Sequence, residues 1–292
     1  MPDFDDKRLT PPPGRGTPWQ VLAASVAVRE APAADARLAS EALHGEALDV
    51  HDAKDGFALV QCRRDRYIGW ADVRGISEGI TGRTHRVATL RTHAYAAPDL
   101  KSPPMMVLSL GALVRVTGQE GDWRHCDGAG WVNSRHLEVN YDPSGSLAPV
   151  MPDAVSVALK FLGTPYLWGG RTSLGLDCTG LTQQAFEAAG VLLPRDSDMQ
   201  FAWCGAAIAD WRAPGVLRRG DLVFWKGHVG VMTDPETLLH ANAWHMAVAQ
   251  EPLQDAITRI ANYYAEPIGA RRIDVSSERG QVPAWKASPA AA

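Results

Sequence analysis

The pattern of hydrophobic and polar positions changes at about residue 150 of the chain. Before this point, short apolar segments are separated by turn residues such as Asp55-Gly56, a pattern typical of β-strands joined by tight turns. Beyond it, apolar positions first recur at helical spacing, and strand-like segments follow. The first series of expected strands comprises 21–28, 47–50, 57–62 and 67–71.

A second series of strand-like segments resembles the first. Each copy has a turn, an aromatic-led strand, another turn and a Gly-Trp pair, as in DGFALVQC with YIGWADV and in GDWRHC with GAGWVNS. Two such copies about 60 residues apart indicate a repeat, and Gly turns between short strands favour small barrels over an open sheet. We therefore expect one barrel at 21–80 and a second at 81–140. The expected strands of the second copy are 86–91, 108–116, 119–123 and 130–132.

Proline and glycine are frequent at 1–20 and again at 141–152. Proline fixes φ and removes a backbone donor, so neither stretch is expected to be helical. We expect the first to be an extended arm. The second is expected to be a linker to a further domain at 153–292.

The expected domain at 153–292 begins with two helices. One spans 154–162 and stops at Gly163, and the other runs from Cys178 to Ala189 with Gly190 as its C-terminal cap. Helices followed by an antiparallel sheet make an α+β layout. The expected strands are 221–225, 228–232, 238–242, 247–250 and 268–273.

Composition argues against several classes of function. The 292 residues are 46% hydrophobic and carry a formal net charge of −4 without a basic block, which argues against a nucleic-acid partner. No apolar run approaches the ~20 residues that span a bilayer, and the N-terminus lacks the pattern of a secretory signal, so we expect a cytoplasmic protein without a membrane span. The four cysteines form no CxxC pair and no dense framework, so we expect neither a metal cluster nor a disulfide scaffold. No cofactor and no metal are expected. The oligomeric state stays open.

Cys178 is the main candidate for chemistry because it opens the second expected helix. Unpaired N–H groups and the dipole at a helix start favour a thiolate, and the same groups can bind an oxyanion. The alternative is a small buried packing residue, as cysteines commonly are. Cys62, Cys126 and Cys204 lack such a setting and are interpreted as packing residues.

A cysteine nucleophile needs a base, and histidine titrates near neutrality. His228 opens an expected strand after a Lys-Gly turn, and His240 lies on the next expected strand. His228 could therefore take the thiol proton while His240 orients it. A lone histidine is more often structural, and the residues alone leave both interpretations open.

The motifs around these residues resemble those of the NlpC/P60 cysteine peptidases. They are PYLWGGRTSLGLDCTGLTQQAFEAAG, RGDLVFWKGHVGVM and LLHANA, and the resemblance covers about 153–273. It implies a papain-like catalytic domain with Cys178 as the nucleophile and His228 as the general base. It also implies that His240 orients the base and that Tyr166 assists the oxyanion hole.

The two expected barrels resemble the bacterial SH3 domains of γ-D-glutamyl-L-diamino acid endopeptidases of the dipeptidyl-peptidase VI type. That resemblance implies murein-peptide substrates with a free N-terminal L-Ala, whose ammonium group needs carboxylate and hydroxyl partners. Tyr67 and Trp70 could instead be barrel core, Trp168 could simply pack, and Thr179 replaces the commoner serine. The residues implied to bind substrate are Asp177, Thr179, Asp196, Ser197, Trp168, Tyr67 and Glu30.

These features predict a cysteine peptidase that cleaves between γ-D-Glu and the diamino acid, diaminopimelate or Lys, in cell-wall peptide recycling. One alternative is a murein hydrolase that acts on intact peptidoglycan, which would need export. Another is a non-catalytic module that binds wall peptides through its barrels. An enzyme with an ammonium pocket should refuse an N-acetylated substrate, which separates the first two hypotheses.

Overall fold

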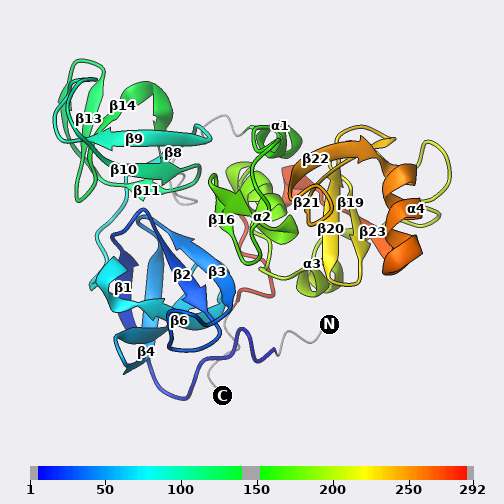
Figure 1. The fold of residues 1–292 in the computed structure, drawn as a ribbon, viewed down its shortest axis with the longest axis horizontal. Coiled ribbons are helices and arrows are strands. Elements are labelled where there is room, and N and C mark those ends of the chain that lie inside the picture. The colour runs from blue at the N-terminus through cyan, green and yellow to red at the C-terminus, as the bar shows by residue number, and fades with distance from the viewer. Residues whose placement is uncertain (1–5, 140–151, 288–292) are drawn as a thin grey trace. The chain divides into compact units, whose positions relative to one another are not determined.

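The computed structural model describes residues 6–139 and 152–287, so the expected linker at 141–152 lies almost entirely outside the described residues (Figure 1). The described chain divides into two compact units. The barrel unit comprises 6–139 and the short segment 169–174, and the α+β unit comprises the rest. The expected domain at 153–292 is therefore interrupted by a segment that packs with the barrels.

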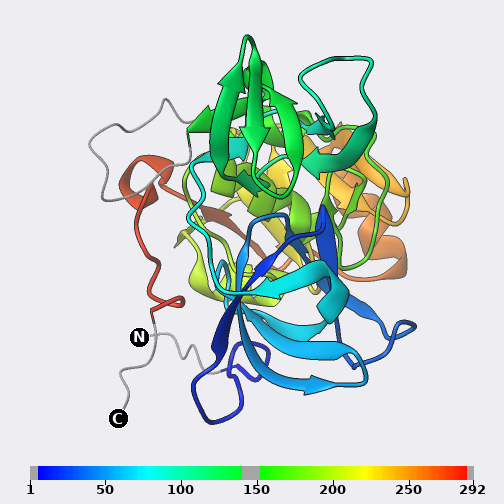
Figure 2. The same ribbon diagram turned by 90° about the vertical axis from the view of Figure 1, so that its left-hand side faces the viewer.

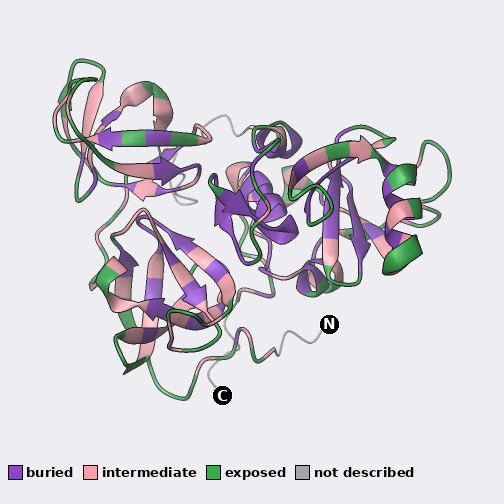
Figure 3. Cartoon of the chain, viewed as in Figure 1, coloured by how far each residue is buried: buried purple, intermediate pink, exposed green. Residues whose placement is uncertain are grey.

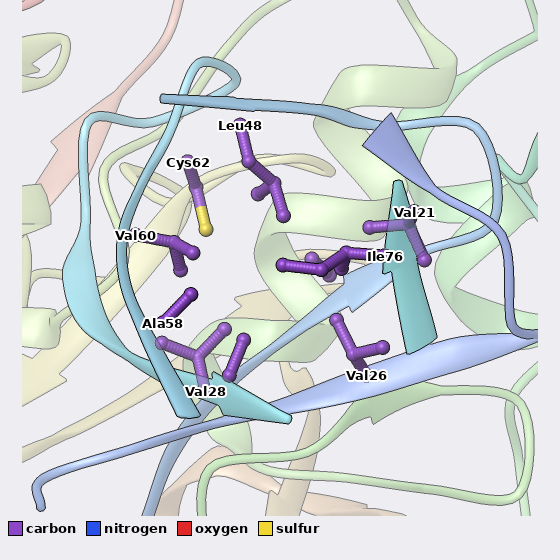
Figure 4. Close-up of a cluster of buried hydrophobic side chains, with 10 residues drawn as sticks. Val21, Val26, Val28, Leu48, Ala58, Val60, Cys62 and Ile76 are labelled. Carbon is purple, nitrogen blue, oxygen red and sulfur yellow. The ribbon is translucent and has the colours of Figure 1, made fainter. Parts of the chain in front are cut away.

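The strands of the first barrel are β1 (Thr17–Val21), β2 (Ser25–Arg29), β3 (Leu38–Leu43), β4 (Ala47–Lys54), β5 (Phe57–Cys62), β6 (Ile68–Asp72) and β7 (Ile76–Glu78). They form one sheet in the order β3-β2-β6-β5-β4-β1-β7. Alternate side chains point inward, and Figure 4 shows Val26, Val28 and Val60 converging in the core. Asp55 and Gly56 have φ of 51° and 81°, so the predicted turn between β4 and β5 is confirmed.

The strands of the second barrel are β8 (His85–Val87), β9 (Arg91–Tyr95), β10 (Pro104–Ser109), β11 (Leu113–Val114), β12 (Val116–Glu120), β13 (Trp123–Cys126), β14 (Gly130–Asn133) and β15 (Leu137–Val139). They form sheets in the orders β10-β9-β14-β13-β12 and β11-β8-β15 (Figure 2). The β5-β6 and β13-β14 hairpins each lead into a 3-10 turn. Asp72 caps the first turn through the Arg74 N–H, and Asn133 caps the second through the Arg135 N–H. Both hairpins therefore lead into the same kind of capped turn, as the predicted repeat implies.

The two barrels share part of their cores. Leu43, the last residue of β3, packs with Val87 and Leu108 of the second barrel. The Leu113 N–H donates to the His44 carbonyl at 2.8 Å. The barrels expected at 21–80 and 81–140 therefore form one compact unit.

Two expectations for the N-terminal region differ from the structure. The expected strand at 21–28 is interrupted at Leu22, whose N–H donates to the Gly75 carbonyl at 2.9 Å and not to a neighbouring strand. The expected extended arm at 1–20 ends in β1. Leu9 within this arm is buried, because an apolar side chain gains free energy by leaving water. Its carbonyl also accepts a hydrogen bond from the Gln61 side chain at 2.7 Å.

The helices of the α+β unit are α1 (Ala154–Leu159), α2 (Cys178–Ala188), α3 (Ser197–Trp203), α4 (Leu253–Tyr263) and α5 (Val275–Glu278). Its strands are β17 (Gly175–Leu176), β18 (Ala206–Ala207), β19 (Leu222–Trp225), β20 (His228–Met232), β21 (Thr237–Asn242), β22 (Ala247–Pro252) and β23 (Gly269–Arg272). The sheet is antiparallel, in the order β18-β23-β19-β20-β21-β22, so the α+β class is confirmed. Among the described residues, no helix is both long and apolar enough to cross a membrane.

Helices cover the sheet of the α+β unit on both sides (Figure 1). Leu253 and Ile257 of α4 pack in a cluster with Val223 of β19. The next residue, Phe224, points to the other face and contacts Phe201 of α3, with 5.3 Å between ring centroids. Figure 3 shows that α2 and the central strands are almost completely buried. This packing fixes the start of α2, where Cys178 lies.

The segment 169–174, which includes β16 (Arg171–Thr172), is anchored in the barrel unit by buried charge. Arg171 is 1% exposed, donates to the Glu41 carbonyl at 2.6 Å, and pairs with Glu46 at 3.2 Å. Arg64 approaches the same Glu46 carboxylate at 3.6 Å. A buried charge requires such partners, so this cluster holds the segment to the first barrel.

Candidate active site

Cys178 is the first residue of α2, as the sequence predicts. The side chain of Asp177 caps this helix and accepts from the Gly180 N–H at 2.7 Å. A capping Asp satisfies one of the N–H groups that a helix start leaves unpaired. The Asp-Cys-Thr-Gly sequence therefore places the thiol directly at a helix start.

The cap is reinforced by Arg195, which binds the Asp177 carboxylate through two nitrogens at 2.6 and 3.0 Å. The Thr179 hydroxyl donates to Asp177 at 3.0 Å and accepts from Arg195 at 2.5 Å. All three side chains are buried. These contacts give Asp177 and Thr179 a structural role at the helix start, and their contact with substrate stays a prediction.

The electrostatics of Cys178 differ from the expectation for a helix start. Burial is the main cause that raises the pKa of its thiol to about 12, and the Asp177 charge acts in the same direction. The backbone N–H groups of Val229 and Thr179 and the charge of Arg195 lower the pKa, but by less. Desolvation therefore outweighs the helix effect, and the resting thiol is protonated at pH 7.

His228 and His240 lie in contact on adjacent strands. His228 opens β20, His240 lies on β21, and the Nε2 of His228 is 2.9 Å from the Nδ1 of His240. The N–H of Val229, next to His228, is a hydrogen-bond partner of Cys178. The structure thus places Cys178 beside β20, the strand that His228 opens, and joins His228 to His240. Transfer of the thiol proton to His228 stays a prediction.

Both imidazoles are neutral at pH 7. Burial lowers the pKa of His228 to about 3, and the neighbouring His240 also lowers it. Burial lowers the pKa of His240 too, although its hydrogen bond to the Glu251 carboxylate opposes that shift. Only a neutral imidazole can accept a proton, but a lowered pKa also weakens it as a base. The role of His228 as the general base therefore stays a prediction.

Two residues that sequence reasoning missed continue this chain of contacts. The Nε2 of His240 is 2.7 Å from the Glu251 carboxylate on β22, and Arg259 on α4 forms an ion pair with the same carboxylate. The sequence signal for this helix was the spacing of the apolar residues on one face of α4, which are Leu253, Ala256, Ile257 and Ile260. A helix predicted from that spacing would have placed Arg259 close to the sheet.

The other predicted site residues of the α+β unit lie near the starts of α2 and α3. Tyr166 is half-buried, and burial raises the pKa of its hydroxyl. An ionised Cys178 would raise this pKa further, so the two side chains lie within electrostatic range. Trp168 is 59% exposed. Asp196 precedes α3 and Ser197 opens it. Their contacts with substrate stay predictions.

Glu30 and Tyr67 belong to the barrel unit. Glu30 is exposed and lies 3.9 Å from Arg37 across a surface ion pair. Tyr67 is 7% exposed, and its backbone N–H donates to the Asp65 carboxylate at 3.1 Å. The participation of both residues in the site stays a prediction.

The remaining cysteines are free and buried, as expected for packing residues. Cys62 lies in the core of the first barrel and Cys126 in that of the second. Burial raises the pKa of both thiols. Neither thiol is expected to react at neutral pH.

One group of described side chains has donor atoms close enough for a metal ion. These atoms belong to His240, His245 and Glu251 and lie within 4.8 Å of one another. The Arg259 guanidinium already neutralises Glu251, so a dication would face a positive charge there. The donor set therefore fits an ion poorly.

Comparison with known proteins agrees with this geometry. Residues 163–263 match the model of the NlpC/P60 family, and residues 28–76 match that of the bacterial dipeptidyl-peptidase SH3 domain. Dipeptidyl-peptidase 6 of Lysinibacillus sphaericus is 34% identical over 90 residues, which cover 31% of this chain and 32% of that protein. A gamma-D-glutamyl-L-lysine dipeptidyl-peptidase of Bacillus cereus is 31% identical over 132 residues, which cover 42% of this chain and 37% of that protein. The matches span about a third of the length of these relatives.

Solved structures show the same fold over more of the chain. An NlpC/P60 family protein from Bacillus cereus aligns with a TM-score of 0.73 at 20% identity, over 88% of this chain and 99% of that one. An NlpC/P60 endopeptidase from Photobacterium damselae subsp. piscicida aligns with a TM-score of 0.61 at 15% identity, over 90% of this chain and 74% of that one. At these identities the likeness shows the fold alone. This chain combines an NlpC/P60 family domain with a bacterial dipeptidyl-peptidase SH3 domain.

Proposed function

We propose that the protein is a cytoplasmic cysteine peptidase of cell-wall recycling. It cleaves the bond between γ-D-Glu and the diamino acid of murein peptides that have a free N-terminal L-Ala. The observation that carries the proposal is the arrangement of Cys178 at the start of α2, beside the His228–His240 pair with its 2.9 Å contact. The names of the relatives, which are dipeptidyl-peptidases, support the same class of substrate.

In the proposed reaction, Nδ1 of His228 takes the Cys178 proton as the sulfur attacks the γ-D-Glu carbonyl. The Cys178 N–H and the Tyr166 hydroxyl stabilise the oxyanion of the tetrahedral intermediate. The C–N bond then breaks, and the His228 imidazolium protonates the leaving amine of the diamino acid. Water, activated by the same imidazole, hydrolyses the thioester and regenerates the thiol.

Selectivity for short peptides is proposed to come from the free amine. A desolvated ammonium needs carboxylate and hydroxyl partners, because an unpaired buried charge is costly. Asp177 and the segment Arg195-Asp196-Ser197 supply these groups in the α+β unit, and Tyr67 and Glu30 supply them in the barrel unit. Trp168, whose side chain is exposed, is proposed to contact the substrate.

The test is mass spectrometry of the products from L-Ala-γ-D-Glu-diaminopimelate, offered with a free or an acetylated N-terminus. We expect cleavage of the free peptide only, and a loss of at least about 10⁴-fold in Cys178→Ala because the nucleophile is removed. The matched control is Cys62→Ala, which removes another buried thiol and should keep activity.

Three results would contradict the proposal. Full activity of Cys178→Ala would exclude the nucleophile, and inhibition by EDTA would indicate a metal. Equal cleavage of the acetylated peptide and of intact peptidoglycan would favour the murein hydrolase hypothesis. Binding of the peptide without turnover would favour a non-catalytic module.

A further inference from the structure

A line of polar contacts crosses three neighbouring strands and ends on a helix. It runs from His228 on β20 to His240 on β21, then to Glu251 on β22 and to Arg259 on α4. Leu238 is paired with Glu251 and is two residues from His240, so these side chains share one face of the sheet. A Cβ at Gly230 would lie 2.6 Å from the Leu238 Cδ1 and 3.2 Å from the His240 Cβ, so this glycine lets both side chains of β21 pack against β20.

We infer that Glu251 and Arg259 are positioning residues that set which nitrogens of His240 and His228 carry hydrogen. The inference rests on the proposed cysteine-peptidase function. An ionised carboxylate can only accept hydrogen bonds, so Glu251 requires the hydrogen of neutral His240 on Nε2. The Nδ1 of His240 then accepts, and the facing Nε2 of His228 must carry its hydrogen.

This sequence of donors and acceptors leaves the Nδ1 of His228 with a lone pair. In the reversed tautomers that nitrogen would carry a hydrogen and could not take the proton of Cys178. Glu251 thus sets the form of a base two hydrogen bonds away, without contact with the reacting atoms. The carboxylate also raises the pKa of both imidazoles and partly offsets their burial.

Arg259 keeps Glu251 in the ionised form that this arrangement requires. Burial alone would raise the pKa of Glu251, but the contacts with His240 and Arg259 outweigh it and lower the pKa. Arg259 is itself held in place. Its NH1 donates to the Tyr263 hydroxyl at 3.1 Å, and its guanidinium lies 5.2 Å from the centroid of the Trp244 ring.

The test compares Glu251→Ala with the unsubstituted protein by ¹⁵N NMR of the histidine rings and by the rate of iodoacetamide alkylation of Cys178. We expect the unsubstituted protein to show His228 and His240 protonated on Nε2. In Glu251→Ala we expect mixed tautomers, alkylation slower by about 100-fold, and a kcat lower by a similar factor with KM little changed. Glu251→Gln should retain much of the activity, because Arg259 orients its carbonyl oxygen toward His240. The control is Glu266→Gln, which breaks an exposed ion pair with Arg212 and should change neither readout.

Unchanged tautomers and an unchanged alkylation rate in a folded Glu251→Ala variant would overturn the inference. A Glu251→Gln variant as impaired as Glu251→Ala would also count against tautomer control. Both readouts are made without substrate. If no murein peptide is cleaved but the tautomers shift as expected, the proposed function fails while the positioning role stands.

Discussion

The two units of this protein each contain a buried arginine–carboxylate cluster, and the clusters have different tasks. In the barrel unit, Arg171 joins the segment 169–174 to Glu46 of the first barrel. In the α+β unit, Arg195 braces Asp177, the cap of the helix that begins with Cys178. The same chemistry anchors a chain segment in one unit and shapes a helix start in the other.

The two clusters flank the segment that leads to Cys178. Arg171 and Asp177 are six positions apart in the sequence, and each is fixed within a different unit. The chain that leads to Cys178 therefore passes from the barrel unit into the α+β unit between these two residues. Buried ion pairs add little net stability, but removal of one partner leaves an unpaired charge and costs several kcal/mol.

The largest expected effect comes from breaking the two clusters separately. Arg171→Met removes one of the two arginines near the Glu46 carboxylate. Arg195→Met removes the guanidinium that binds the Asp177 carboxylate through two nitrogens. Each variant should lose about 3–5 kcal/mol of the free energy of unfolding, confined to its own unit. Hydrogen exchange with mass spectrometry resolves the units peptide by peptide.

An exposed pair provides the control for these two variants. Arg212→Met breaks the pair with Glu266, whose side chains are more than half exposed, and should cost less than about 1 kcal/mol. If both buried variants destabilised the same unit, the assignment of one cluster to each unit would be wrong.

A smaller change in stability is expected when the pH is lowered, and it should differ between the units because their buried histidines differ. Burial lowers the pKa of His228 to about 3, and it lowers the pKa of His240 and of His44 in the barrel unit. A folded pKa below the unfolded value means that the unfolded chain binds more protons. The stability these groups contribute is therefore complete above pH 6.5 and is lost as the pH falls toward the folded pKa.

We expect the α+β unit to lose about 2 kcal/mol between pH 6.5 and pH 5 through His228 alone. The barrel unit should lose less of its free energy of unfolding over the same pH range. Hydrogen exchange at pH 7, 6 and 5, corrected for the intrinsic exchange rate, measures the loss in each unit. Equal losses in the two units would show that His228 is protonated in the folded state at a higher pH than its burial implies.

Much of the fold could be predicted from local signals. The start of α2, its glycine cap, the β-hairpins and the repeat all depend on residues that are neighbours in sequence, such as Asp177 and Gly190. The expected contact between His228 and His240 followed from strand order. These features involve short-range geometry, which periodicity and turn residues encode.

The features that sequence reasoning missed depend on burial or on distant contacts. No local pattern assigns 169–174 to the barrel unit, since its partners Glu41 and Glu46 lie about 130 positions earlier. The raised pKa of Cys178 reflects desolvation by the whole unit and not its helix position. Glu251 lies beyond the expected end of its strand, and its partner Arg259 lies on a helix that was not predicted.

The smallest expected effect concerns the two barrels. In the repeat, Tyr67 of the first barrel aligns with Gly128 of the second, so the first barrel has a hydroxyl at this position and the second has none. The proposed function assigns the Tyr67 hydroxyl to the substrate amine. Tyr67→Phe should lower kcat/KM for the free tripeptide by about tenfold, the worth of one hydrogen bond to a charged group. Steady-state kinetics with mass-spectrometric detection measures this change.

Tyr95→Phe in the second barrel is the matched control for this substitution. Its ring packs edge-on against Trp123, with 5.4 Å between centroids, and the loss of its hydroxyl should leave kcat/KM within about twofold. If Tyr67→Phe also stayed within this range, the first barrel would not bind the amine through this hydroxyl. If both variants lost activity equally, the two barrels would act through stability and not through a specific contact, and the functional distinction between them would fall.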